Sequence, residues 1–370
     1  MASKPITHVA TTDIEEMMAP GLERRMDLPG FDEEFVDFPQ YIIRITERSW
    51  HDRDVEKCLD WYAEDCAIHT MAGDISGAQT VVDNTWATLK AFPDRRLDAD
   101  IVIWSDEGDG AFYSSHLITS KMTNEGASEF GPVTGKRLRI QTIADCLCKD
   151  NRVIEEWLVR DNLAAVQQLG FDADRVAKDQ AQSDKINNFS LIEFHTANRD
   201  AVQTKEQVDT NVSDAIQIAA RALRSSFSDT SLETLREVYD FRASASFPGD
   251  VLAYGPDQIQ AWMSELLKAF PDPKLSIDHA AEVPYLGNAM DVALRWSATG
   301  THQGAGRYGA PRGAPVFFLG VTQFRIINSR VREQVTIWDD IALRRQIVTA
   351  RNSYGLATLP GRRASPPLGP

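Results

Sequence analysis

The sequence predicts an α+β protein built from two tandem copies of one domain. Three observations indicate this: an internal repeat with a constant spacing, helical patterns that precede strand patterns in each copy, and a length of 370 residues. A chain of that length exceeds what one hydrophobic core normally organises. Hydrophobic residues make up 43% of the chain and charged residues 25%, which is typical of globular proteins. We therefore expect two well-filled cores.

The repeat is visible in a four-residue motif. Residues 91–94, Ala-Phe-Pro-Asp, recur at 269–272, an offset of 178 (269 − 91). This offset holds without a gap as far as Asp161 and Asp339, and sixteen of the seventy-one paired positions are identical. The identities gather in turns and at element ends, and they include Gly126 with Gly304, Gly135 with Gly313, and Val153 with Val331. Such a pattern indicates an internal duplication.

Each copy is expected to begin with helices and to end with strands. In the first copy, Pro39 suits the first turn of a helix whose apolar positions recur at helical spacing from Ile42 to Trp50. A second helix over 54–62, a short strand at 66–71 and a third helix over 79–90 follow. Strands are predicted at 97–105, 111–123, 136–149 and 152–160, with a last helix at 162–169. The helices can cover one face of this meander.

These elements divide the chain into five segments. The two domains are predicted at 35–170 and 209–348, with an N-terminal arm at 1–34, a linker at 171–208 and a tail at 349–370. The first thirty residues and the Pro-rich tail are expected to be disordered. The polar linker is expected to be a solvated helix or a loose connector.

Charge and cysteine content restrict the partners. The formal net charge of −15 repels nucleic-acid phosphates and anionic lipid. No apolar run has the length of a signal peptide or of a membrane helix. Cys58, Cys66, Cys146 and Cys148 lack the spacing of a zinc site and are expected to be reduced and buried. We expect a cytoplasmic protein that binds a small molecule without a metal, a cofactor, nucleic acid or a membrane.

Three motifs resemble the SnoaL-like polyketide cyclase branch of the nuclear-transport-factor-2-like superfamily. They are the Ala-Phe-Pro-Asp motif at the end of the third helix, the glycine-rich turns at 126–135 and 304–313, and the last strand running into Asp161. The resemblance covers about 35–170 and 210–348. It implies a cone-shaped, curved antiparallel sheet with three covering helices around a small-molecule pocket. That fold hosts isomerases, cyclases, dehydratases and non-enzymes, so it implies no single activity.

One departure from the family concerns its acid-base aspartate. In the cyclases this residue lies three positions before the equivalent of Asp161. Here that position holds Leu158 in the first copy and Thr336 in the second. Either the chemistry has moved to other residues or there is none.

The first copy carries histidines where the second copy is apolar. His69 follows the second helix and is a candidate general base, and the offset of 178 pairs it with Phe247. His116 lies in mid-strand, where the second copy has Leu294. A buried polar group without a partner lowers the stability of the fold by about 1–3 kcal/mol, so a polar residue kept at such a position indicates a function. Each could instead be a satisfied, partly buried histidine. We expect both imidazoles to border one cavity.

Two carboxylates complete the catalytic candidates. Asp145 interrupts an apolar strand, and it is either partnered by Arg or His or carries a raised pKa. Glu156 lies on the face of strand 152–160 that differs between the copies, and we expect that face to line the pocket. The face that the copies share is expected to serve the architecture of the domain or a sheet-to-sheet interface. The candidates for substrate binding are Tyr113, Trp157, Arg160 and Trp338.

Two further patterns are expected to be structural. Asp161 and Asp339 directly precede the final helices, where an aspartate accepts hydrogen bonds from the first free backbone N–H groups. The Gly-x-Gly-x-x-Gly run at 304–309 links two strands and opens no helix, so it predicts a turn rather than a dinucleotide site.

Three functions remain open from the sequence. The first is a cofactor-independent acid-base enzyme of the isomerase, cyclase, lyase or dehydratase type, acting on a small, largely apolar molecule in the first domain. The second is a binding or carrier protein without turnover. The third is a scaffold in which the second copy replaces a subunit of a homodimer, with further association of whole chains left open. The polar residues of the first copy favour the enzyme, with a degenerate second domain.

Overall fold

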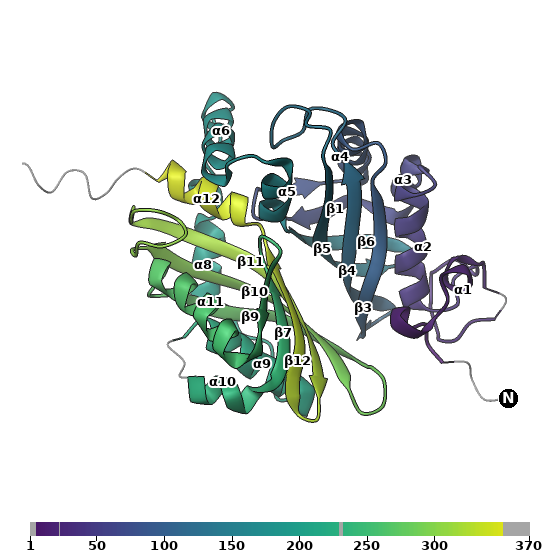
Figure 1. Cartoon of the computed structure of the whole chain (residues 1–370). Coiled ribbons are helices and arrows are strands. Elements are labelled where there is room, and N and C mark those ends of the chain that lie inside the picture. Colours follow the sequence, from purple (N-terminus) through teal and green to yellow (C-terminus); the bar gives the residue numbers. More distant parts are fainter. Residues whose placement is uncertain (1–4, 22, 229–231, 351–370) are drawn as a thin grey trace, which may run out of the picture.

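The computed structural model describes residues 5–21, 23–228 and 232–350 and contains two domains with one order of elements (Figure 1). The first comprises α2 (Phe38–Trp50), η2 (Val55–Lys57), α3 (Cys58–Trp61), β1 (Tyr62–His69), β2 (Ile75–Ser76), α4 (Ala78–Ala91), β3 (Arg96–Gly108), β4 (Ala111–Thr123), β5 (Arg137–Lys149), β6 (Arg152–Arg160) and α5 (Asn162–Leu169). The second comprises α9 (Asp214–Ser226), α10 (Leu232–Val238), β7 (Tyr239–Phe247), β8 (Val251–Tyr254), α11 (Gly255–Ala269), β9 (Lys274–Pro284), β10 (Met290–His302), β11 (Ala314–Ile327), β12 (Arg330–Trp338) and α12 (Asp340–Thr349).

Each domain has one six-stranded sheet. The strand orders are β2-β1-β6-β5-β4-β3 and β8-β7-β12-β11-β10-β9, so the two sheets share one topology. The predicted α+β class with two tandem copies is confirmed. Each sheet is mixed rather than purely antiparallel, because β1 runs parallel to β6 and β7 runs parallel to β12. The two-residue strand β2 was not predicted, because so short a segment gives no periodic pattern.

Helix starts follow from local sequence in both copies. The Asp37 side chain accepts a hydrogen bond from the backbone N–H of Gln40, and Pro39 lies in the first turn of α2 as predicted. Gly77 directly precedes α4 and Gly255 is the first residue of α11, and their φ values are +90° and +71°. Only glycine adopts such values without strain, so the same junction is kept in both domains.

The N-terminal arm contributes to the core of the first domain, so the expectation of disorder is wrong there. It contains η1 (Val9–Thr11) and α1 (Ile14–Met18). Leu28 and Phe31 are buried in one cluster with Phe38 and Tyr41 of α2. Residues 28, 31, 35 and 38 recur at helical spacing, but the segment before Phe38 forms turns and bends rather than a helix, and Pro29 and Gly30 mark it as a loop in the sequence. The tail from residue 351 lies outside the described residues.

The linker is helical and is held against both domains. It forms α6 (Ala173–Ile186), α7 (Leu191–Phe194) and α8 (Thr196–Thr204). Ion pairs join Arg344 of α12 to Asp174 and Arg345 to Asp184, both in α6. Within the described ranges, no helix is long and apolar enough to cross a membrane.

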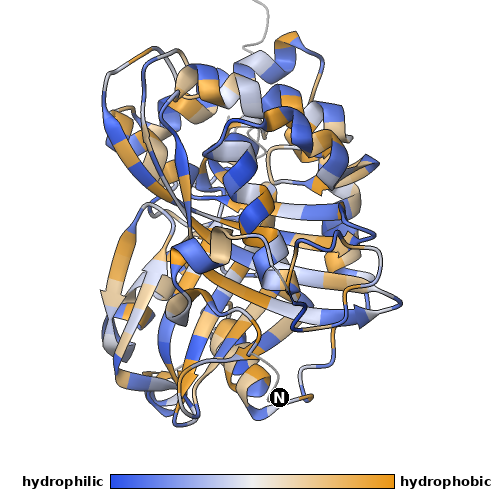
Figure 2. Ribbon diagram, turned by 90° about the vertical axis from the view of Figure 1, so that its right-hand side faces the viewer, coloured by the Kyte–Doolittle hydropathy of each residue, from blue (hydrophilic) through white to orange (hydrophobic). Residues whose placement is uncertain are grey.

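The sheets of the two domains pack against each other. The Gln323 side-chain amide in β11 donates to the carbonyl and the hydroxyl of Ser115 in β4, both at 3.0 Å. Hydrophobic residues run through the strands of both domains, interspersed with hydrophilic ones (Figure 2). An apolar cluster spans the interface and contains Ile103, Tyr113, Ala281, Val283 and Ala293.

The two capping aspartates also join the domains. Asp161 accepts from the N–H of Ala164 in its own helix, and from the N–H groups of Gly249 and Asp250 in the β7–β8 turn of the second domain. Asp339 caps α12 and accepts from the Asn162 side chain at 2.7 Å. The predicted caps are confirmed, and each has a second role at the interface.

Replacing Asp161 by alanine is expected to lower the free energy of unfolding by about 2 kcal/mol, because a cap and part-buried bonds to two further backbone N–H groups are lost together. Asp339→Ala loses a cap and one side-chain bond and should cost less. Urea unfolding of the full chain measures both. A smaller loss for Asp161→Ala than for Asp339→Ala would contradict the proposed contribution of the β7–β8 turn.

Candidate functional site

Strand pairing shows how the first sheet divides its side chains between two faces. Directly paired residues on neighbouring strands share a face, and successive residues alternate between faces. One row of paired residues is His69, Trp157, Asp145 and Ser115, and the adjacent row is Ile68, Glu156, Cys146 and Ser114. The first row meets the second domain, so we call its side the interface face. The second row packs towards α2, so we call its side the covered face.

The covered face brings three predicted residues together: His116, Glu156 and Arg160. Glu156 lies in the row of Ser114, His116 in the next row, and Arg160 beside Thr142 in the third. Neighbouring strands are ~4.8 Å apart and alternate residues ~7 Å apart, which places the Cα atoms of Glu156 and His116 about 12 Å apart in a flat sheet. That distance suits a small molecule between the side chains rather than a direct hydrogen bond.

Glu156 is a buried carboxyl group, and few nearby groups stabilise its charged form. Its residue is 6% exposed, and burial raises the pKa of the carboxyl to about 7, although the Arg160 charge and a hydrogen bond from the Tyr62 hydroxyl act to lower it. None of the ion pairs among the described residues includes Glu156. A carboxyl group with such a pKa can both accept and donate a proton near neutral pH.

His116 is buried without a partner on the same face. Burial lowers the pKa of its imidazole to about 3, so the ring is neutral at pH 7. Its Nε2 atom and the Ser114 hydroxyl are both buried and have no hydrogen-bond partner among the described residues. Unpartnered buried polar groups are costly and are commonly explained by a function or by a bound molecule.

Three polar residues of the covered face escaped the sequence analysis. The first is Tyr62, whose hydroxyl forms a hydrogen bond with Glu156. The second is Thr142, whose hydroxyl is buried without a partner among the described residues. The third is Arg95, which is 6% exposed and donates to the Ser120 hydroxyl at 3.1 Å. Comparison of the copies could have found two of them, because the offset of 178 replaces Arg95 by Pro273 and Thr142 by Gly320.

The covered face of the second domain is filled with aromatic side chains. Gln334 replaces Glu156, and its side-chain oxygen accepts from Tyr239, the counterpart of Tyr62, at 2.7 Å. Trp296 lies over Gly320, where an added Cβ would come within 2.2 Å of the indole. Trp338, predicted to bind substrate, is 1% exposed, with its ring centroid 6.0 Å from that of Trp296. The site in this domain is therefore occupied by its own core.

His69 lies on the interface face, so the expectation that it shares a cavity with His116 is wrong. Its imidazole bonds to Asp74 and Glu155, both at 3.0 Å, and stacks on Trp157. The bond to Asp74 is the main cause that raises the pKa of His69. Its partner in the second copy is Ser246 rather than Phe247, because the offset in this strand is 177 (246 − 69). The β7–β8 hairpin of the second domain is one residue longer than the β1–β2 hairpin of the first, so the offset of 178 does not apply to β1 and β7.

Tyr113, Asp145 and Trp157 also lie on the interface face. The Tyr113 hydroxyl donates to the Asp145 carboxyl, whose pKa is raised by burial. The Tyr113 ring packs on His279, with centroids 3.7 Å apart, and the Arg295 guanidinium lies 3.4 Å from the centroid of Trp157. These three predicted residues therefore contact the second domain instead of the residues on the covered face.

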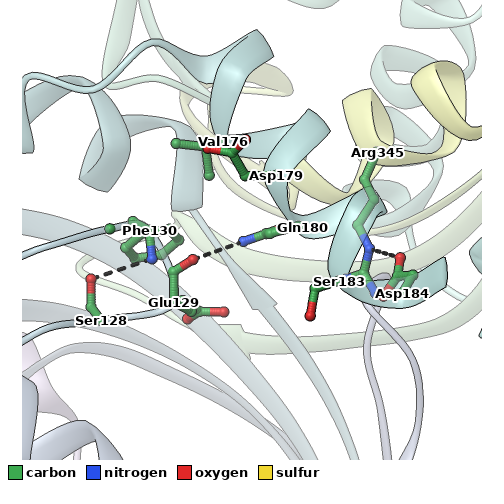
Figure 3. Close-up of a pocket in the computed structure, with 10 residues that line it drawn as sticks. Ser128, Glu129, Phe130, Val176, Asp179, Gln180, Ser183, Asp184 and Arg345 are labelled. Carbon is green, nitrogen blue, oxygen red and sulfur yellow. Dashed lines mark hydrogen bonds and ion pairs between the residues drawn. The ribbon is translucent and has the colours of Figure 1, made fainter. Parts of the chain in front are cut away.

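Two cavities of the molecule lie away from the covered face. One of about 400 Å³ is lined by the 128–131 loop, by α6 and by Arg345 (Figure 3). In it, the Gln180 side chain donates to the carbonyl of Glu129, and Arg345 pairs with Asp184. None of the predicted site residues lines it or a second cavity of about 130 Å³ beside Tyr308. The described part of the chain contains no group of three potential metal ligands.

Solved structures similar to this chain are single proteins of about one domain. A protein described as a SnoaL-like polyketide cyclase from Jannaschia sp. CCS1 is 19% identical, with 40% of this chain and 99% of that chain covered and a TM-score of 0.33. A SnoaL-like polyketide cyclase from Agrobacterium tumefaciens is 17% identical, with 36% and 97% covered and a TM-score of 0.31. A protein with a ketosteroid isomerase-like fold from Catenulispora acidiphila is 14% identical, with 36% and 92% covered and a TM-score of 0.29. Comparison with curated proteins gives no match.

The fold and the repeat define a tandem protein of two mixed-sheet domains, each with a helix-covered face. The family model of the SnoaL-like polyketide cyclases matches residues 40–169 and 217–347, one match for each domain. The chain belongs to this family, which agrees with the resemblance carried by its turns and its last strand.

Proposed function

We propose that the protein is a cofactor-independent acid-base enzyme whose active site is the covered face of the first domain. The observation that carries this proposal is the buried Glu156 carboxyl, with a pKa near 7, on one face with the unpartnered groups of Ser114 and His116. A general acid or base works best when its pKa lies near the working pH. Structural carboxylates are instead usually paired or fully hydrogen-bonded.

Family membership supports a reaction at a carbon next to a carbonyl group, in a small, largely apolar substrate. Glu156, as a carboxylate, takes a proton from that carbon, and the bonding electrons move onto the carbonyl oxygen to form an enolate. The neutral His116 ring has an unpartnered Nε2 that can donate a hydrogen bond to this oxygen. Return of the proton at another carbon gives an isomer, whereas attack of the enolate carbon on a second carbonyl closes a ring.

The position of Glu156 supports a shift of the acid-base residue along β6. The family aspartate is replaced by Leu158, and Glu156 lies two residues earlier in the same strand. Residues two apart share a face, so both positions serve the same side of the sheet. The glutamate is one methylene longer, which extends its reach along the strand.

We propose that the second domain is catalytically degenerate and stabilises the first. Gln334 keeps the hydrogen bond to tyrosine but cannot exchange a proton as a carboxyl group does. The interface residues of the second domain, including Arg295 and Gln323, contact the first sheet directly. This role combines the enzyme with the scaffold that the sequence also allowed.

A cytoplasmic location is part of this proposal. All four cysteines are buried and free in the structure. Unpaired cysteines at this frequency are usual in reducing compartments, whereas secreted domains generally pair them.

The proposal predicts that Glu156→Gln slows proton exchange at carbon by at least about 100-fold, the contribution typical of a positioned base. The full chain is incubated in D2O with 2-tetralone and with an aromatic β-keto ester, and the loss of the α-proton signal beyond the rate without protein is followed by NMR. Glu155→Gln is the matched control, because Glu155 lies next in sequence on the opposite face. No protein-dependent exchange across this panel, or equal losses in the two variants, would count against the proposal.

A further inference from the structure

One end of the covered face carries two positive charges, one buried and one half-buried, that no ion pair among the described residues neutralises. Arg95 and Arg160 are near enough to influence each other electrostatically, and neither takes part in an ion pair among the described residues. Arg95 packs against Trp50, with the guanidinium 4.6 Å from the ring centroid, and burial lowers its pKa to about 9. The Glu129 charge acts to raise the pKa of Arg95, but no hydrogen bond or ion pair joins the two residues in the described part of the chain. Two like charges held close together, one of them buried, are unfavourable by themselves.

The unpartnered groups at this end can all donate hydrogen bonds. The Nε atoms of Arg95 and Arg160 and the hydroxyl of Thr142 are each buried without a partner in the described ranges. Arg160 and Thr142 are directly paired across β6 and β5, so their side chains leave the sheet side by side. Guanidinium groups only donate, so the partner that this cluster lacks is a hydrogen-bond acceptor. With two positive charges beside it, an anionic acceptor fits better than water.

The second domain has lost this whole set. At the offset of 178, Arg95, Ser120, Thr142 and Arg160 correspond to Pro273, Ala298, Gly320 and Trp338. All four polar residues are thus replaced by residues without a polar side chain or by a core tryptophan. Loss of every member in one copy and retention of every member in the other indicates that the four act together.

We propose that Arg95, Arg160 and Thr142 bind the carboxylate group of the substrate, which is therefore an organic acid. The inference rests on the proposed function only in placing the substrate on this face. Arg160 also lies four residues from Glu156 on the same face of β6, about 13 Å along the strand. A molecule anchored by its carboxylate at Arg160 can thus present a carbon some ångströms away to the Glu156 carboxyl. Trp50 beside Arg95, Ile118 beside Thr142 and Leu158 in β6 are apolar and suit a carbon skeleton.

Calorimetric titration of the full chain with 2-naphthoate and with 2-naphthamide tests the site directly. Because charged hydrogen bonds contribute about ten- to hundredfold each, we expect the acid to bind at least tenfold more tightly than the amide. Arg160→Met should abolish that preference, whereas Glu156→Gln should keep it, so binding is tested independently of turnover. Arg139→Met is the control on the opposite face of the sheet.

The stability of the ligand-free protein gives a second readout. Arg160→Met removes a half-buried charge that lies near Arg95 and forms no ion pair among the described residues, so its melting temperature without ligand should equal or exceed that of the wild type, while the upward shift caused by 2-naphthoate should vanish. Arg95→Met is expected to give the same two results. If Arg95→Met folds poorly, the test is made with Arg160→Met only. Equal or undetectable binding of acid and amide by the wild type, an unchanged preference in Arg160→Met, or inorganic phosphate binding as tightly as 2-naphthoate would each overturn the proposal.

Discussion

Replacing Glu156 by glutamine is expected to stabilise the protein at pH 8 by about 3 kcal/mol, since a pKa raised from 4.5 to about 7 corresponds to that difference between the folded and unfolded states. Above pH 7 the wild-type carboxyl must be ionised in a buried site. Glutamine has nearly the same shape and carries no charge. A residue kept at such a cost to stability is what acid-base chemistry requires.

The direction with pH follows from the sign of the shift. Because the folded pKa of Glu156 is raised, the folded protein holds the proton more tightly, and stability from this group is fully present below pH 4.5 and is lost as the pH rises through about 7. His116 acts in the opposite sense: its folded pKa is lowered from 6.5 to about 3, so stability falls as the pH decreases below 6.5. The difference between wild type and Glu156→Gln isolates the first effect.

Urea unfolding of both proteins at pH 5 and pH 8 measures this prediction. The gain in Glu156→Gln should be small at pH 5 and near its full size at pH 8. Glu155→Gln, on the opposite face, should show no such gain. A Glu156→Gln variant that is less stable than wild type at pH 8 would mean that the carboxylate is a paired structural group, and the acid-base assignment would fall with it.

The repeat made most of the fold predictable. A constant offset marked equivalent turns, and strands 111–123 and 152–160 agree with β4 and β6. The same comparison led to Glu156 and Arg160, since their strand face differs between the copies. It failed for His69, because the hairpin after β1 differs in length by one residue and a strand alternates faces at every residue. A shift of one position therefore exchanged the two faces.

Asp145 and Tyr113 show a different limit. Both are polar residues inside apolar strands, which is the pattern of a site and equally of a buried interface. Their partners, Arg295 and His279, lie some 130 to 180 residues away and on the other domain, so no local spacing connects them. Only the packing of the two sheets reveals that this polar cluster lies between the domains.

The second domain should respond to truncation as a packed core. Trp338→Ala is expected to lower the free energy of unfolding by about 3–5 kcal/mol, the range for deleting a fully buried aromatic side chain. The ring is 1% exposed and lies among Trp262, Trp296 and Phe318, so its removal leaves a cavity that rigid neighbours cannot fill. Denaturant unfolding of the full chain provides the measurement.

Two control variants are compared with Trp338→Ala. Trp338→Phe should cost much less than Trp338→Ala, because most of the ring volume remains and the indole N–H has no partner to lose. Arg160→Ala, at the equivalent position of the first domain, should cost little, because it removes an unpaired charge rather than packed volume. If Trp338→Ala left stability unchanged, the indole would line an open site, and the second domain would require a ligand of its own.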